Sequence, residues 1–240
     1  MNENKLEFDI LPQPNEVTCG PTCLHALYKF YGEQVSLASV ISEVRMLKQG
    51  GTLAVLLALH ALRRGYSARI YTYNLHVFDP TWFRTPDFDI ASRLRRQMEI
   101  KKNNHKLVVA TKAYLEFLRL GGELRFEDMR PSLIRKYLKK GVPILTGTSA
   151  TYLYHESREM EDCTYDDVAG EPSGHFVVLK GYEQDGREVH VADPLTPNPV
   201  GNVHHYMVSI ERVIGAILLG VLTYDANILI IEPPKEDKGS

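Results

Sequence analysis

The sequence of 240 residues lacks a long apolar run and lacks the start of a secretory protein. No apolar stretch approaches the roughly 18 residues that would predict a membrane-spanning helix. The polar residues Met1 to Lys5 precede no apolar core, so the N-terminus does not resemble a signal peptide. We therefore expect a chain without a membrane span that resides in the cytoplasm.

The sequence also has neither a large net charge nor many cysteines. The formal net charge is −2, which argues against a dedicated nucleic-acid-binding protein, because such proteins carry strongly basic surfaces. Three cysteines are too few for a disulfide framework, and the odd number leaves at least one thiol free. A hydrophobic content of 44% and a charged content of 24% are typical of a globular protein, and the length suits one large domain or two small ones.

A cysteine stands at the start of a predicted helix. Pro21 suits the first helical turn, an apolar helical pattern follows it, and Gly32 ends that pattern. Cys19 is therefore expected where unpaired backbone N–H groups favour the nucleophilic thiolate. Gln13 lies six residues upstream, and its amide could join the Cys19 N–H in a pocket for an oxyanion. A small buried thiol is the commoner state of a free cysteine, so this helix alone does not identify a nucleophile.

Two strands further along the chain supply complementary groups. His175 opens an apolar segment typical of a buried strand, Asp193 ends the next such segment, and Asp185-Gly186 between them indicates a hairpin. A simple two-residue turn would place Val178 opposite Asp193, and His175 would then point to the other face of the sheet. We therefore predict a bulge, a longer turn, or departure of the chain from the sheet at Asp193.

The combination of these four residues is more specific than any of them alone. A histidine opening a strand is usually structural, and an aspartate before proline usually starts a turn. Together the residues supply the four roles of one chemistry: Cys19 attacks, His175 holds and returns the proton, Asp193 orients the imidazole, and Gln13 binds the oxyanion.

These residues resemble the papain-like cysteine peptidases, and more narrowly the bacteriocin-processing, double-glycine-leader peptidase family and its stand-alone relatives. The resemblance covers roughly residues 10–65 and 132–196. It implies an α+β fold with a helical half packed on an antiparallel sheet, with Cys19 as nucleophile, His175 as base, Asp193 as orienting residue and Gln13 as oxyanion donor. The matching residues are Gln13, Cys19-Gly20-Pro21-Thr22-Cys23-Leu24, Gly174-His175-Phe176-Val177-Val178-Leu179 and Asp193-Pro194.

The sequence departs from the best-known members of that family, which are fused to a membrane transporter with an ATPase. It contains no apolar span and no Gly-x-x-x-x-Gly-Lys-Ser/Thr phosphate loop.

We expect one domain over residues 1–232 with an insertion at about 74–130, followed by a disordered tail at 233–240. Weaker patterns predict a lead-in strand over residues 6–11. They also predict a short helix near 209–216, followed by a hairpin of two strands, 217–224 and 227–231.

The predicted function is hydrolysis of a peptide or amide bond in a peptide or peptide-like substrate, without a cofactor. We expect no metal, because His204-His205, His190 and Cys163 lack the spacing of a closed zinc site. Two alternatives stay open: an acyltransferase or other peptide-modifying enzyme that passes the acyl group to an amine, and a non-catalytic peptide-binding module. The acidic segment 151–173 could form a lid that favours basic peptides, although a solvated loop explains it more simply. The sequence indicates no oligomeric state.

Overall fold

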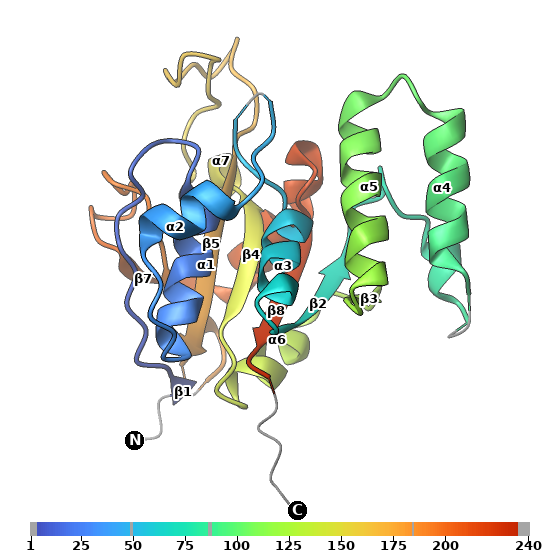
Figure 1. Cartoon of the computed structure of the whole chain (residues 1–240). Coiled ribbons are helices and arrows are strands. Elements are labelled where there is room, and N and C mark those ends of the chain that lie inside the picture. Colours follow the sequence, from blue (N-terminus) through green and yellow to red (C-terminus); the bar gives the residue numbers. More distant parts are fainter. Residues whose placement is uncertain (1–3, 49, 86–87, 184, 235–240) are drawn as a thin grey trace, which may run out of the picture.

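One mixed β-sheet organises the chain, and helices cover both of its faces (Figure 1). The computed structural model describes residues 4–48, 50–85, 88–183 and 185–234. The strand order is β3-β2-β8-β4-β5-β6-β7, and β1 pairs with β5. All of these pairs are antiparallel except β2 with β3. The strands are β1 (Asn4–Lys5), β2 (Ser67–Thr72), β3 (Glu123–Arg125), β4 (Ile144–Ser149), β5 (Gly174–Tyr182), β6 (Glu188–Ala192), β7 (His205–Ser209) and β8 (Asn227–Glu232).

Two apolar cores lie on opposite faces of this sheet. Along β5, Phe176 and Val178 belong to the core under the N-terminal helices, whereas Val177 and Leu179 belong to the core under the C-terminal helix. This alternation is the period of two that a strand buried on both faces requires. The helices are α1 (Cys19–Phe30), α2 (Leu37–Glu43), α3 (Ala54–Arg63), α4 (Ile90–Ile100), α5 (His105–Arg119), α6 (Pro131–Leu138), α7 (Ala150–Tyr154) and α8 (Ile210–Leu219), with 3-10 turns η1 (Pro80–Phe83) and η2 (Gly220–Thr223).

Helix α1 begins at Cys19, as the sequence predicts, and it is buried along almost its whole length. Gly20 permits this close packing. A Cβ at Gly20 would lie 2.7 Å from Cγ2 of Thr52 and 3.2 Å from side-chain atoms of Leu57 and Phe176. The chain turns away after Gly32, whose φ of +82° suits glycine. The cysteine is therefore fixed at a helix end that presses on the sheet.

The segment 74–130 contains η1, the neighbouring helices α4 and α5, and β3. Figure 1 shows α4 and α5 side by side beyond the edge of the sheet formed by β2 and β3. Helix α5 buries Tyr114 and Phe117 in the first core, whereas α4 buries only Leu94 among its described residues. The assignment of this segment as an insertion in a single domain stays a prediction.

Two predictions of secondary structure are wrong. Residues 6–11 form no strand: the ladder with β5 ends at Lys5, and after one last bond from the Leu6 N–H to the Lys180 carbonyl the chain leaves the sheet edge. Phe8 and Ile10 are buried against the first core. Residues 217–224 are the end of α8 and η2, because Ile210, Val213 and Ile217 continue one buried helical stripe. No hairpin forms there. Strand β8 pairs with β2 and β4, and β7 was not predicted. Of the predicted tail at 233–240, residues 235–240 lie outside the described residues.

Candidate active site

A β-bulge at Lys180 brings the predicted histidine and aspartate together. Gly181 pairs with His190, but Leu179 pairs with Val191, so Lys180 is an extra residue in β5. Beyond the bulge Val178 pairs with Ala192, the last residue of β6. Continued by one residue, this register sets Asp193 level with Val177, two residues from His175 and on the same face. The bulge that the sequence predicted as one of three solutions is therefore present.

His175 and Asp193 form a buried pair. Nε2 of His175 lies 2.8 Å from Oδ1 of Asp193, and the two residues are 7% and 0% exposed. Burial disfavours the imidazolium, but the Asp193 carboxylate and the Cys19 side chain outweigh this effect and raise the pKa of His175 to about 10. Burial also opposes the carboxylate, but His175 and other hydrogen-bond donors lower the pKa of Asp193 to about 2. The geometry therefore favours an imidazolium beside a carboxylate.

Three further donors reach the Asp193 carboxylate. The Leu195 N–H donates to Oδ1 at 2.9 Å, whereas the phenols of Tyr154 and Tyr206 donate to Oδ2 at 2.7 and 2.6 Å. Neither tyrosine was among the residues predicted from the sequence. No motif marks them, because each is an ordinary residue of its helix or strand, and only the folded chain shows where their hydroxyl groups end.

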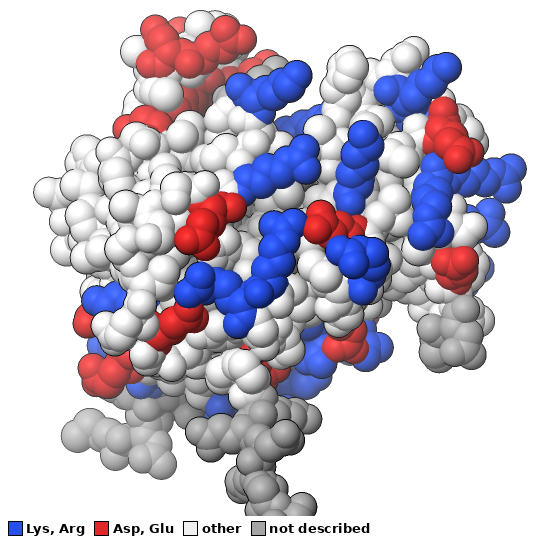
Figure 2. Space-filling model, viewed as in Figure 1, with Lys and Arg blue, Asp and Glu red and all other residues white. Residues whose placement is uncertain are grey.

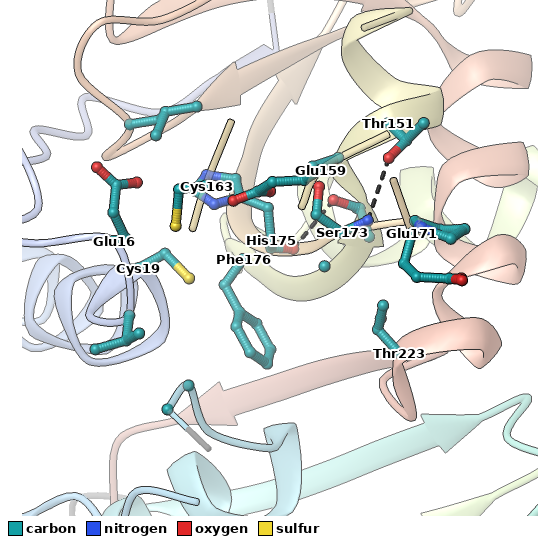
Figure 3. A pocket seen from close by; sticks show the side chains of 18 of the residues that line it. Glu16, Cys19, Thr151, Glu159, Cys163, Glu171, Ser173, His175, Phe176 and Thr223 are labelled. Carbon is teal, nitrogen blue, oxygen red and sulfur yellow. Dashed lines mark hydrogen bonds between the residues drawn. The ribbon is translucent and has the colours of Figure 1, made fainter. Parts of the chain in front are cut away.

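Cys19 and His175 border the same cavity, which has a volume of about 840 Å³. Figure 3 shows Cys19 at the start of α1 with its sulfur directed into this space. The Cys19 side chain lies close enough to the His175 imidazole to help raise its pKa. Because Nε2 of His175 faces Asp193, Nδ1 is the ring atom left for the sulfur. The structure thus brings Cys19, His175 and Asp193 into one chain of contacts, although their catalytic roles stay predictions.

The two other cysteines have different surroundings. Cys23 is fully buried one turn further along α1, and its thiol donates to the Phe176 carbonyl at 3.2 Å. Burial, followed by the nearby Cys19 and Asp193, raises the pKa of Cys23 well above its ordinary value. Cys163 is exposed, and its hydrogen bond to Glu159 is the main cause of its raised pKa. Both therefore stay protonated near neutral pH.

Gln13 lines the cavity with Cys19 and His175, but one hydrogen of its side-chain amide is already engaged. Its Nε2 donates to the Asn15 carbonyl at 3.0 Å, which leaves one of two amide hydrogens for another acceptor. Its own N–H donates to the Pro194 carbonyl at 2.8 Å. This bond ties the segment before α1 to the residue that follows Asp193.

The segment 155–173 covers one side of the cavity. Bridges from Glu159 to Tyr165 and Glu171 give it internal order, and Arg158 donates to the carbonyls of Asp167 and Val168. Figure 2 shows acidic side chains gathered at the end of the molecule where this segment lies. The carboxylates that line the cavity include Glu16, Glu156, Glu159, Glu161 and Glu171.

The described part of the chain contains no candidate metal site and no candidate membrane-spanning helix. Within it, no three histidine, cysteine or acidic side chains are placed to share a metal ion. No helix in the described ranges has both the length and the apolar character that crossing a bilayer would need.

Comparisons with known proteins agree on a family and a fold. A model of the peptidase C39-like family matches residues 5–212. A structure described as a C39-like peptidase from Bacillus anthracis is 15% identical, with a TM-score of 0.51, over 97% of this chain and 98% of that chain. This likeness supports the papain-like α+β fold that the sequence predicted.

Two other solved structures are more distant. The peptidase domain of Streptococcus ComA, a bi-functional ABC transporter involved in quorum sensing, is 15% identical over 95% of this chain and 99% of that chain, with a TM-score of 0.44. A double glycine motif protease from the AMS/PCAT transporter, in complex with the leader peptide, is 14% identical over 95% and 94%, with a TM-score of 0.46. No curated protein matches the chain significantly. The family and the fold together suggest cysteine peptidase activity.

Proposed function

This chain belongs to the peptidase C39-like family, and on that basis we propose that it cleaves peptide bonds through a thioester at Cys19. His175 would be the general acid and base, Asp193 the residue that orients it, and Gln13 a donor to the oxyanion. One observation carries the proposal: His175 contacts both Cys19 and Asp193 at the border of a cavity, although the three residues come from distant parts of the sequence.

Acylation follows from the charges around His175. The Cys19 thiolate attacks the substrate carbonyl carbon, a C–S bond forms, and the carbonyl electrons move to oxygen. The first-turn N–H of α1 at Cys19 and the second amide hydrogen of Gln13 are suited to that oxyanion. His175 then gives its Nδ1 proton to the leaving nitrogen, the C–N bond breaks, and the amine departs. Asp193 remains ionised throughout.

In deacylation His175 acts as a base, whereas in acylation it acts as an acid. The neutral imidazole takes a proton from water, and the resulting hydroxide attacks the thioester carbon. The C–S bond breaks, the acid is released, and the thiolate and imidazolium are restored. If an amine replaces water, the same steps give acyl transfer, which is the alternative that the sequence left open.

Incubation with a peptide library and mass analysis of the products would test this proposal. The parent should release peptides with free carboxylates, and Cys19→Ala should release none. Cys23→Ala is the matched control, because it removes a thiol that lies outside the cavity lining, and it should retain cleavage. Cleavage that persists in Cys19→Ala would refute the proposal. Products that form only with added amines would favour acyl transfer, and peptide binding without products would favour a binding module.

A further inference from the structure

The second oxygen of the Asp193 carboxylate is held by two phenols from different parts of the fold. Tyr154, the last residue of α7, donates to Oδ2 at 2.7 Å, and Tyr206 of β7 donates to the same atom at 2.6 Å. The other oxygen accepts from His175 at 2.8 Å and from the Leu195 N–H at 2.9 Å. An ionised carboxylate offers about four lone-pair sites, so these four donors occupy all of them.

We propose that Tyr154 and Tyr206 are positioning residues, which hold the Asp193 carboxylate so that its other oxygen faces His175. This inference rests on the proposed function of the Cys19 and His175 pair. The four donors come from β5, α7, β7 and the loop after β6, and rotation of the carboxylate would break bonds to several of them at once. The main chain is fixed as well, because the Asp193 N–H and carbonyl both contact His204, through its carbonyl and Nδ1.

Phenols suit this task because they donate without charge. A cationic donor on Oδ2 would compete with the imidazolium for the carboxylate, whereas a neutral donor leaves the negative charge for His175. Burial is the main cause that raises the pKa of Tyr154 and of Tyr206 well above the ordinary value, so both keep their protons. The remaining titratable groups around Asp193 are Cys19 and Cys23 of α1 and His204, whose Nδ1 lies 2.8 Å from the Asp193 carbonyl oxygen.

The test combines two measurements on Tyr154→Phe, Tyr206→Phe and the double variant. Tyr152→Phe is the matched control, because it makes the same change on α7 at a residue that is 41% exposed and outside the cavity lining. Carbon-13 NMR of labelled aspartate, assigned with Asp193→Asn, gives the protonation midpoint of Asp193. Iodoacetamide labelling of Cys19, followed by mass spectrometry at pH 4 and pH 7, gives the consequence for the reacting pair.

Each lost phenol should raise the Asp193 midpoint by about one pH unit, because each removes a hydrogen bond to the charged form. The parent value is about 2, so the double variant should titrate near ~4. At pH 4 about half of its Asp193 would be protonated and would no longer hold the imidazolium beside Cys19. Relative to the parent, Cys19 labelling in the double variant should therefore fall about twofold more at pH 4 than at pH 7. A purely structural loss would lower the rate by the same factor at both pH values.

The positioning role is overturned if the double variant gives the same Asp193 midpoint as Tyr152→Phe, or if its labelling rate scales equally at both pH values. Thermal unfolding establishes that each variant is folded. If the double variant is not, the single variants carry the comparison, since each keeps one phenol on Oδ2. A parent in which Cys19 labels no faster than Cys23 and Cys163 refutes the proposed function, and the positioning role falls with it. A reactive parent with an unmoved double variant refutes the positioning role alone.

Discussion

Replacement of Asp193 by asparagine should remove the charge that keeps His175 protonated. Asparagine has nearly the same volume, so the change is chiefly one of charge. The pKa of His175 is raised from 6.5 to about 10, and each unit corresponds to about 1.36 kcal/mol between the two protonation states. Removal of one partner from a buried pair typically costs roughly 3–5 kcal/mol. We expect Asp193→Asn to lose about 3–5 kcal/mol of unfolding free energy near pH 6.

The sign of the pH dependence follows from both partners. A raised histidine pKa contributes stability that is complete below pH 6.5 and is lost as the pH rises through about 10. A lowered aspartate pKa contributes stability that is complete above pH 3.8 and is lost as the pH falls through about 2. The difference between parent and variant should therefore be largest between about pH 4 and pH 6.5 and should shrink toward pH 10.

Urea unfolding from pH 5 to pH 10 measures that difference, and NMR titration of the His175 ring measures its cause. Asp185→Asn is the matched control, because the same change there lies in an exposed turn. It should leave the His175 midpoint unmoved. The reasoning is refuted if His175 titrates at the same pH in Asp193→Asn as in the parent, or if the loss of stability is the same at every pH.

Three other predictions follow from groups around the cavity. Burial raises the pKa of Asp225 from 3.8 to about 7, so the parent loses stability as the pH rises between those values. Urea unfolding should therefore show Asp225→Asn to be more stable than the parent at pH 8, by up to roughly 4 kcal/mol, and no more stable at pH 4. Gly20→Ala should lower stability by about 1–3 kcal/mol in thermal unfolding, because its Cβ would overlap Thr52. The glutamates of the cavity should speed cleavage of lysine-containing peptides over glutamate-containing analogues, an advantage that added salt should reduce toward parity.

Local sequence signals were sufficient to predict the helix and the two strands that carry the predicted site residues. Pro21 and Gly32 marked the two ends of the helix behind Cys19, because a proline in the first turn and a glycine after the last have direct backbone causes. The strand that begins beside His175 and the strand that runs up to Asp193 were marked by apolar runs on either side of a hairpin signal. These signals act within a few residues, and a sequence displays them directly.

Features that depend on distant parts of the chain could not be predicted from such local signals. The sequence showed that a plain hairpin would separate His175 from Asp193, but only the fold shows the bulge at Lys180 and the end of β6 at Ala192, just before Asp193. Tyr154 and Tyr206 carry no motif, since their role depends on where α7 and β7 pack. The apolar residues after position 216 suit a helix or a strand equally well, and packing on the second core decided for the helix.

Rates of iodoacetamide labelling at the three cysteines test the central claim most directly. Cys23 and Cys163 are kept protonated by their surroundings, whereas Cys19 contacts an imidazolium that Asp193 stabilises. At pH 7 Cys19 should label at least about tenfold faster than either, and His175→Ala should abolish the advantage. Equal, slow labelling of all three thiols in the folded protein would contradict the account.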